Sequence, residues 1–400
     1  MITVDQALDV VLKSVTALPT ESVPVTDALG RVLAQSVEAD MDLPPFDRSR
    51  MDGYALRSAD AHLTPVTLRV LGSIAAGAAF DGTVGPGEAV KIFTGAPLPH
   101  GADAVQKVEA TESDAQSVII KEPVKPGQFV TPRASEVHAS DVVLNSGRVI
   151  GAAEMAVLAS FGCERVIVGA RPRVSVISTG SELVEVSARP TGSQIRNSNT
   201  YSILAYAERA GATVKGLGMV PDSLDETRRA LLKASEAGDI VITSGGVSMG
   251  DYDLVKAALV DLGAEVYFDK VAIRPGKPTV FARRGETCYF GLPGNPVSTA
   301  VTFNVFVWPA IRRMQGDPAP NLPTTRAELA QSIRDASSRR SYLPGRLSIR
   351  NGRAIVESLR WGGSSDFVAF IEANALIVVG EDTHDIEAGQ MVEVLSLNPL

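Results

Sequence analysis

One segment of the chain combines glycines, hydroxyls and carboxylates at close spacing. It reads TSGGVSMGDYD, Thr243 to Asp253, and follows the apolar run DIVI. Backbone amides and hydroxyls of a glycine-rich loop can hold a phosphate group. The carboxylates of Asp251 and Asp253 would repel that phosphate unless a divalent cation bridged carboxylate and phosphate oxygens. The segment therefore predicts a phosphate site that uses Mg²⁺, although capping of the next helix explains Asp251 equally well.

Three further loops place glycine beside proline or hydroxyl residues: STGSEL (178–183), RPGKP (274–278) and LPGNPVS (292–298). In the last loop Asn295 is a candidate N-cap and Pro296 is the first helical position. The free amides of that helix would then face the end of the sheet and favour an anion.

Positive charge beside these loops can come from RPGKP, where Arg274 suits a forked contact and Lys277 acts as a point charge. A glycine turn after a strand is more often a structural connection than a ligand site, so one such loop is a weak signal. Four of them at one edge of one sheet favour a ligand site at that edge.

Further acids occur near these loops. Glu182 lies in STGSEL. Asp222 lies in a Pro-Asp-Ser turn, so its side chain can have a structural role in that turn instead of a functional one. Two segments nearer the N-terminus, FDRSRMDGYA and IFTGAPLPHGADAV, are dense in turn residues. A tight turn explains Asp52 as well as a function does, and a solvated loop position explains His100 better.

The elements that must position these loops follow an α/β pattern from Pro172 onward. The expected strands are residues 174–177, 239–242, VYFDKVAI, PTVFA and CYFGL, and the expected helices are 200–210, one begun by a Ser223/Glu226 capping box, 253–262 and 296–314. Such alternation predicts a mostly parallel sheet with helices on both faces. Ligands of such sheets bind beyond the carboxyl ends of the strands, where TSGGVS and LPGNP would lie.

The rest of the chain predicts a multidomain α/β plus β protein. A Thr3/Gln6 capping box opens a first helix, and the Pro-rich piece GDPAPNLPTT is typical of a linker. The predicted domains are residues 1–42 together with 135–171 (helical and linking), 43–134 (an inserted β-domain), 172–316 (the α/β domain) and 317–400 (a C-terminal β-domain).

Composition excludes several classes of protein. A formal charge of −8 over 400 residues argues against a general nucleic-acid binder. No apolar run approaches the roughly 18 residues of a membrane span, and the start MITVDQALDV lacks the pattern of a signal peptide. The two cysteines lack metal spacing and favour a reducing cytoplasm. The P-loop, GxSxG and HExxH patterns do not occur.

The loops, taken in order, resemble a known family. FDRSRMDGYA, GEAVKIFTGAPLPHGADAV, STGSEL, IRNSNTY, TSGGVSMGDYD, RPGKP, LPGNPVS and SSDFVAFIEANAL follow the order found in molybdopterin molybdenumtransferases, the MoeA family, which is also similar to the C-terminal domain of gephyrin. The resemblance covers essentially the whole chain, and MDGYA, TGAPLP, SGGVS and LPGNPVS together are highly specific.

The resemblance implies a cytoplasmic enzyme of the last step in molybdenum cofactor synthesis. Such enzymes insert molybdenum from molybdate into adenylylated molybdopterin and release AMP, with Mg²⁺ as cofactor. It also implies a homodimer of four-domain subunits, with the active site between the α/β domain of one subunit and the β-insertion of the other. The upstream molybdopterin adenylyltransferase and acceptor molybdoenzymes are the implied protein partners.

Site residues follow from the resemblance by motif position. The implied catalytic residues are Asp52, Glu182, Asp222, Asp253 and Lys277, with Glu182, Asp251 and Asp253 as candidate metal ligands. The implied binding residues are Thr94, Ser244, Gly245, Gly246, Ser248, Arg274, Asn295, Pro296, Ser298 and Ser365. Two positions depart from the family pattern: Ser181 replaces an acid of the usual TGDEL, and TPRASEV offers Thr131 and Glu136 where RxxGED is usual.

Other functions stay open at this point. A scaffolding protein like the gephyrin domain would not need the acids, and a nucleotide pyrophosphatase on the same α/β module would cleave free dinucleotides. Molybdate and tungstate are tetrahedral dianions of nearly equal size, so the residues do not choose between them.

Overall fold

The computed structural model describes residues 1–247, 254–334, 337–381, 383 and 385–397. Two compact units divide the chain. The first unit comprises Met1–Ala34, Gly147–Gly151 and Val166–Leu400, and the second comprises Gln35–Ser146 and Ala152–Arg165. Predicted residues Ser248, Asp251 and Asp253 lie outside the described residues.

A six-stranded sheet is the centre of the first unit, with the order β16-β13-β17-β21-β20-β18. Its strands are β13 (Arg173–Thr179), β16 (Thr213–Val220), β17 (Ile240–Ser244), β18 (Glu265–Phe268), β20 (Val280–Arg284) and β21 (Thr287–Leu292). β13 pairs in parallel with β16 and β17, and β17 with β21, while β20 is antiparallel to both β21 and β18. Only β20 therefore runs against the other five strands, which confirms the predicted mostly parallel sheet.

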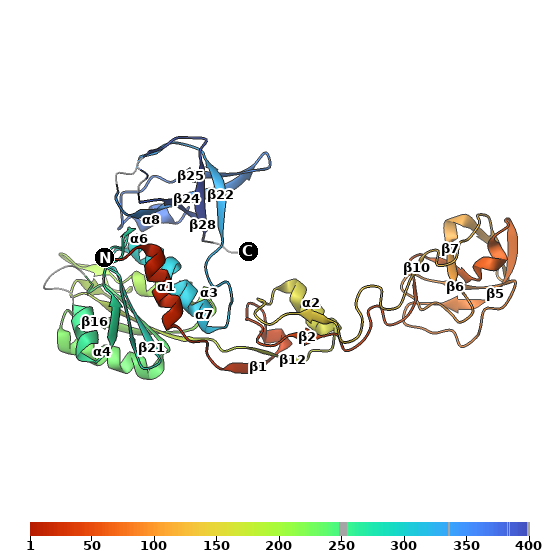
Figure 1. The fold of residues 1–400 in the computed structure, drawn as a ribbon, viewed down its shortest axis with the longest axis horizontal. Coiled ribbons are helices and arrows are strands. Elements are labelled where there is room, and N and C mark those ends of the chain that lie inside the picture. Colours follow the sequence, from red (N-terminus) through yellow and green to blue (C-terminus); the bar gives the residue numbers. More distant parts are fainter. Residues whose placement is uncertain (248–253, 335–336, 382, 384, 398–400) are drawn as a thin grey trace. The chain divides into compact units, whose positions relative to one another are not determined.

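Helices cover both faces of this sheet because its strands alternate their apolar side chains between two cores. Ile240 and Ile242 of β17 pack in the larger core with α1 (Val4–Ser14), α3 (Asn199–Arg209) and the segment 296–314. Figure 1 shows the ribbons of these helices beside the sheet. Val241 packs on the other face with α4 (Leu224–Ala237) and α5 (Leu254–Asp261).

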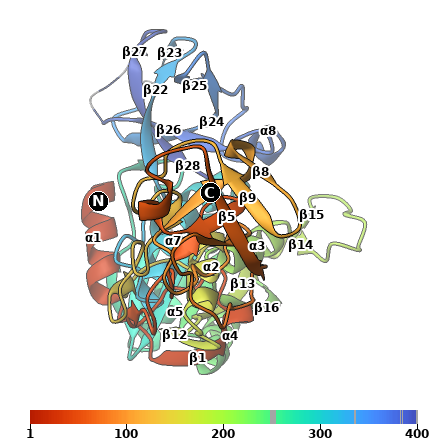
Figure 2. The same cartoon turned by 90° about the vertical axis from the view of Figure 1, so that its right-hand side faces the viewer.

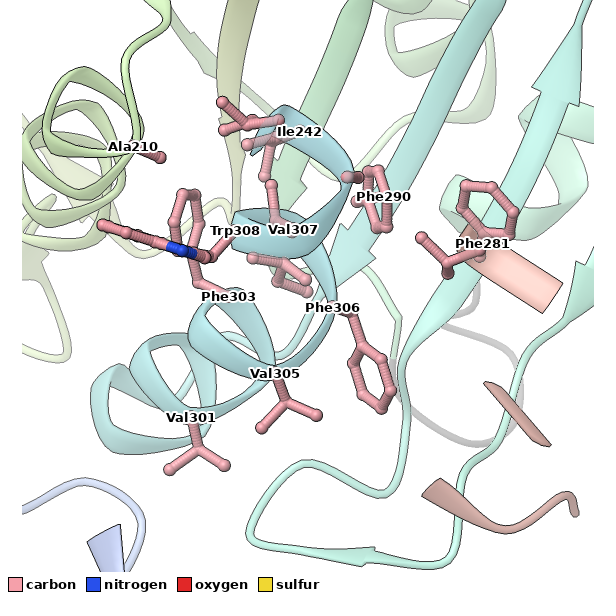
Figure 3. Close-up of a cluster of buried hydrophobic side chains, with 14 of the residues drawn as sticks. Ala210, Ile242, Phe281, Phe290, Val301, Phe303, Val305, Phe306, Val307 and Trp308 are labelled. Atoms are coloured by element: carbon pink, nitrogen blue, oxygen red, sulfur yellow. The ribbon is translucent and has the colours of Figure 1, made fainter. Parts of the chain in front are cut away.

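Residues 296–314 form one helical segment, as predicted, but with a change of hydrogen bonding in the middle. It consists of α6 (Pro296–Thr302), a π-helical turn (Phe303–Val307) and α7 (Trp308–Met314). The π turn is buried, and Figure 3 shows Phe303 and Phe306 projecting from it in different directions into the apolar core. The Asn304 amide donates to the Ala300 carbonyl at 2.8 Å.

A closed ring of five strands follows in the C-terminal part of the first unit, where Figure 2 shows them together. The ring strands are β22 (Thr324–Leu329), β24 (Arg340–Arg350), β25 (Arg353–Ser358), β26 (Ala375–Val379) and β28 (Met391–Ser396). The short β19 (Ile273–Arg274) pairs in parallel with the start of β24. This pairing fixes the RPGKP loop of the α/β domain to the C-terminal barrel.

Smaller elements complete the first unit. They are the pairs β1 (Thr20–Pro24) with β12 (Arg165–Gly169), β14 (Leu183–Val184) with β15 (Ile195–Arg196) and β23 (Ile333–Arg334) with β27 (Asp385–Ile386), the 3-10 turn Val25–Asp27 and the short helix α8 (Phe367–Phe370).

The second unit is mainly β structure, as predicted for the insertion. Its six-stranded sheet has the order β7-β4-β6-β5-β9-β8. The strands are β4 (Gly53–Leu56), β5 (Val66–Ile74), β6 (Glu88–Ile92), β7 (Ala104–Lys107), β8 (Thr111–Ser113) and β9 (Ser117–Ile120). Apart from the parallel pair β5 and β6, the neighbours are antiparallel. All four residues of β4 are buried, because the sheet packs an apolar core on each face.

The second unit also contains short elements outside or beside its six-stranded sheet. They are the pairs β2 (Val37–Glu38) with β11 (Val142–Leu144) and β3 (Arg48–Ser49) with β10 (Val130–Thr131), the 3-10 turns Ser58–Ala61 and Val108–Ala110, and the helix α2 (Ala152–Ser160).

The two predicted capping boxes have different outcomes. Thr3 caps α1 and exchanges hydrogen bonds with Gln6, which confirms the first. Ser223 occupies the N-cap of α4, but within the described chain its side chain makes no capping hydrogen bond, so the second prediction is wrong. No helix among the described residues is both long and apolar enough to cross a membrane.

Candidate active site

A cavity of about 1150 Å³ lies at the carboxyl ends of β13, β17 and β21. This first cavity is lined from three strand ends by Ser178, Thr179, Gly180, Ser244, Gly245, Gly246, Pro293, Gly294, Asn295 and Pro296. Because the three strands are parallel and adjacent, their following loops meet at one edge of the sheet. The structure therefore brings STGSEL, TSGG and LPGNP together.

Two of these loop positions require glycine. Gly245 and Gly246 have φ angles of +91° and +66°, in the region that side chains rarely adopt. A Cβ atom on Gly245 would lie 2.4 Å from the Thr179 carbonyl oxygen, and one on Gly246 would lie 2.7 Å from the Thr179 hydroxyl. The loop after β17 is thus packed directly on the end of β13, which keeps its backbone close to the cavity.

Two acids line the first cavity, Glu182 and Asp222. Asp222 is held by Ser181, whose backbone N–H donates to the Asp222 carboxylate at 3.1 Å. The Asp222 backbone N–H in turn donates to the Ser181 hydroxyl at 3.2 Å. Ser181 stands where the TGDEL pattern has an aspartate. It therefore does not add a carboxylate to the cavity, but its hydrogen bonds hold Asp222 in place.

No group of three or more Asp, Glu, His or Cys side chains that could hold a metal occurs among the described residues. Mg²⁺ commonly takes one or two protein carboxylates, with substrate phosphates and waters as its other ligands. Glu182 and Asp222 beside a phosphate loop match that ligand pattern. The described residues thus fit Mg²⁺ bound together with a phosphorylated ligand.

A second cavity of about 780 Å³ contains basic side chains. Its charged lining residues are Arg274, Lys277, Arg334 and Arg339. The β19–β24 pairing places Arg274 at the start of β24, directly after Arg339, and the Arg339 guanidinium donates to the Ile273 carbonyl at 2.9 Å. Four basic side chains on one cavity favour an anionic ligand over a cationic one.

The two cavities share a wall that consists of Pro278, Pro293 and Asn295. The Asn295 side-chain amide donates to the Ser364 hydroxyl at 2.8 Å, so it connects the LPGNP loop to the C-terminal part of the unit. Ser298 lines the second cavity and Ser365 the first. Residues on both sides of the wall thus come from the predicted loops.

The predicted helix start at LPGNPVS needs one correction. Asn295 is the N-cap of α6 and Pro296 follows it, but the Asn295 side chain makes no capping bond to the helix within the described chain. The Val297 amide, expected to be free for an anion, donates to the Ser364 carbonyl at 3.0 Å. The helix start therefore anchors the C-terminal loop through this amide, which is not free for an anion.

In the second unit, the structure brings Asp52 and Thr94 together. One carboxylate oxygen of Asp52 accepts from the Thr94 backbone N–H at 2.8 Å and from its hydroxyl at 2.7 Å. The backbone bond, and next the hydroxyl bond, hold the pKa of Asp52 below its usual value. This exposed side chain is a fixed, ionised carboxylate at neutral pH.

Sequence reasoning missed several residues of the two cavities. Arg334 and Arg339 lie in a stretch without any glycine or proline signal, and Arg196 and Asn199 of IRNSNTY line the first cavity. IRNSNTY was one of the motifs on which the family resemblance depends, but no role was predicted for any of its side chains. Cys288 is buried, and burial raises the pKa of its thiol to about 11, which excludes it as a nucleophile at neutral pH.

Three family models match successive parts of the chain. They are "MoeA N-terminal region (domain I and II)" at residues 2–162, "Probable molybdopterin binding domain" at 175–313 and "MoeA C-terminal region (domain IV)" at 326–397. Together they span almost the whole sequence, and the second contains the strands and loops of the first cavity.

Full-length relatives are similar to the chain. It is 37% identical to the molybdopterin molybdenumtransferase of Nostoc sp. over 389 residues, 94% of this chain and 89% of the relative. The enzyme of that name from Haemophilus influenzae is 35% identical over 404 residues and covers 100% of both chains. The one from Bacillus subtilis is 35% identical over 384 residues, 94% of this chain and 89% of the relative.

Solved structures agree with this similarity. A crystal structure of a molybdopterin biosynthesis MoeA protein from Pyrococcus horikoshii has a TM-score of 0.83 at 31% identity and covers 100% of both chains. A second structure of a MoeA protein from the same organism has a TM-score of 0.85 at 28% identity, covering 99% of this chain and 100% of the other. The predicted fold class is therefore confirmed.

Proposed function

The chain belongs to the MoeA family of molybdopterin molybdenumtransferases, and we propose that it transfers molybdenum from molybdate to adenylylated molybdopterin with release of AMP. It is an enzyme of molybdenum cofactor biosynthesis, in the final step of that pathway. One observation carries the detailed proposal: a phosphate-loop cavity with two acids shares a wall with a cavity that holds four basic side chains.

In this proposal the first cavity takes the phosphate part of the substrate. The backbone amide of Gly246 and the Ser244 hydroxyl donate to phosphate oxygens, while the Gly245 amide donates to the Leu292 carbonyl at 3.0 Å and holds the loop in place. Glu182 and Asp222 carry negative charge at this cavity, and Asp251 and Asp253, the other candidate metal ligands from the sequence, lie outside the described residues. These acids would hold Mg²⁺, which neutralises phosphate charge when it is bound.

The second cavity takes the oxyanion. Lys277 and Arg274 hold molybdate, and Arg334 and Arg339 add further positive charge to the same space. The shared wall at Pro278, Pro293 and Asn295 supports the proposal that the two ligands bind next to each other. Catalysis is then mainly positioning and charge neutralisation, which needs no protein nucleophile.

We also propose that the enzyme is a cytoplasmic homodimer in which Asp52 of one subunit, fixed by Thr94, serves the substrate bound to the other. A third cavity of about 560 Å³, between α3, α6 and α8, supports a partner surface. It is lined by Tyr201, Phe367 and Ile371, whose exposed fractions are 52%, 48% and 74%. Apolar patches of this kind usually mark an interface. The upstream adenylyltransferase and acceptor molybdoenzymes are the proposed transient partners.

The test uses the purified full chain with adenylylated molybdopterin, Mg²⁺ and molybdate. We expect release of AMP and formation of a cofactor that activates an apo-molybdoenzyme. Absence of both products would reject the proposed reaction. A parallel reaction with a free dinucleotide and no molybdopterin separates the alternatives, because equally fast cleavage there would indicate a general nucleotide pyrophosphatase.

A further inference from the structure

Asn199, the first residue of α3, connects two loops of the first cavity. Its side-chain nitrogen donates to the Ser244 hydroxyl oxygen at 2.7 Å and to the Gly294 carbonyl oxygen at 2.7 Å. Ser244 ends β17, and Gly294 lies in the LPGNP loop after β21. Asn199 is 8% exposed and Ser244 3%, so both hydrogen bonds are shielded from water.

The orientation of this amide follows from its partners. A carbonyl oxygen only accepts hydrogen bonds, so the Asn199 atom facing Gly294 must be the nitrogen. The same nitrogen gives its second proton to Ser244. Because the Ser244 oxygen accepts from Asn199, its own O–H proton stays available for another acceptor. An anion in the first cavity, which Ser244 lines, is such an acceptor.

The Oδ1 atom of Asn199 is a second observation, independent of the Ser244 hydrogen bond, that points to a bound ligand. This atom is buried and has no hydrogen-bond partner among the described residues. Buried polar atoms are almost always paired, and leaving one unpaired costs about 1–3 kcal/mol. Asn199 lines the first cavity, so an O–H or N–H group of a bound ligand can supply the missing donor.

We propose that Asn199 is a positioning residue for substrate binding: it holds Ser244 in the orientation that donates to the substrate's phosphate and fixes the loop after β17 to the loop after β21. The inference rests on the proposed function, because it takes the ligand of the first cavity to be a phosphorylated substrate. It adds a residue that acts through Ser244 and does not itself need to touch the reacting atoms.

Asn197 provides a matched control in the same motif. It is 7% exposed, and its Oδ1 accepts from the Ser178 hydroxyl at 3.0 Å and the Thr200 backbone N–H at 3.2 Å. Its side-chain nitrogen donates to the Thr200 hydroxyl at 2.9 Å. Asn197 is thus a buried asparagine with partners at both ends and no bond to Ser244.

The experiment is a double-mutant cycle with Asn199→Ala, Ser244→Ala and the double variant, and a second cycle with Asn197→Ala in place of Asn199→Ala. Thermal unfolding, kcat, KM and AMP binding by calorimetry are measured for each. We expect Asn199→Ala to raise KM for adenylylated molybdopterin about tenfold and to change kcat less than about threefold, since a ground-state hydrogen bond is lost. In the Ser244→Ala background the same substitution should change KM by less than about threefold.

Several results would overturn the inference. Additive effects of Asn199→Ala and Ser244→Ala, or an Asn197→Ala cycle with the same coupling to Ser244, would show that Asn199 only stabilises the fold. If the wild type binds AMP but releases none from the substrate, the proposed function fails, and the AMP-binding cycle still tests Asn199. A wild type that binds neither substrate nor AMP would reject both.

Discussion

The first and second cavities of the same unit are neighbours but differ in their charged side chains. Glu182, Asp222 and Arg196 line the first, whereas the second is lined by four basic side chains and by no acid among the described residues. The wall that contains Asn295 lies between the two acids of the first cavity and the four basic side chains of the second. In the proposed function this separation gives the cation and the oxyanion different sites.

The two cavities also differ in how the chain builds them. The first is assembled mainly from three loops at one sheet edge, and the C-terminal part of the unit adds Ser365 and Phe367. The second combines the RPGKP loop with Arg334 and Arg339 from the C-terminal part of the unit, and the β19–β24 pairing joins that loop to the strand that follows Arg339. The comparison indicates that the C-terminal barrel contributes charge to the site as well as structure.

Charge reversal in the second cavity should have the largest effect. Lys277→Glu removes a cation and adds an anion beside Arg274, so molybdate would meet repulsion instead of a charge-assisted bond. We expect at least about a hundredfold loss of molybdate-dependent activity. Steady-state rates over a range of molybdate concentrations measure it. Lys277→Arg, which keeps the charge, should lose far less, and equal losses in the two variants would contradict this role.

Removing the charge of an acid in the first cavity should change the Mg²⁺ concentration that the enzyme needs for activity. Glu182→Gln keeps the shape of the side chain but removes its charge, so we expect half-maximal activity to need about tenfold more Mg²⁺. Titration of activity with MgCl₂ tests this. Glu185→Gln is the matched control, since Glu185 follows three residues later and does not line the cavity. An unchanged Mg²⁺ requirement for Glu182→Gln would exclude it as a ligand.

Adding an acid to the first cavity should have a smaller effect in the opposite direction. Ser181→Asp restores the family's usual residue and keeps the backbone N–H that donates to Asp222. The extra negative charge should lower the Mg²⁺ concentration for half-maximal activity about threefold. The same titration measures it, with Ser181→Asn as the uncharged control. A higher Mg²⁺ requirement would show that the serine hydroxyl is needed to hold Asp222.

The smallest effect is expected at Asp52. Its carboxylate accepts two hydrogen bonds from Thr94, whereas the Asp222 carboxylate accepts one from Ser181. Thr94→Val removes the hydroxyl bond but keeps the backbone bond, so the pKa of Asp52 should rise part of the way towards its ordinary value of 3.8. A lowered pKa stabilises the fold above the unfolded value and loses that contribution as pH falls through the folded value. In the variant this contribution is therefore smaller, and its loss is complete at a higher pH than in the wild type.

Carboxyl ¹³C chemical shifts of Asp52 during a pH titration measure this change directly. Thr94→Ser, which keeps a hydroxyl, should titrate like the wild type. An identical midpoint in Thr94→Val would mean that the backbone bond alone sets the pKa.

Patterns within short segments predicted much of the fold. Apolar periodicity located the segment 296–314 and the strand 239–242, because buried faces repeat at fixed spacing. The Thr3 capping box formed as expected, but the Ser223 box did not, since a sequence pattern does not decide which rotamer the cap residue adopts. Local sequence patterns therefore predicted the positions of helices and strands more accurately than they predicted individual side-chain hydrogen bonds.

The candidate site was predictable where its residues lie in glycine and proline loops. Arg339 was missed because only the pairing of β24 with β19 brings it to the second cavity. Asn199 was missed because its bonds reach 45 and 95 residues along the chain. Contacts of this length depend on topology, which composition and spacing do not specify. The roles given to the site residues remain predictions.

The π turn at 303–307 has a consequence for how the family can vary in length. A π turn arises when one residue is inserted into an α-helix, and the helix on either side keeps its original register. Losing one residue there would shorten the segment without rotating α6 against α7. Asn295 would still face Ser364, and Trp308 would still lie in the core. This buried turn is thus where the helix can absorb a one-residue insertion or deletion and leave both cavities intact.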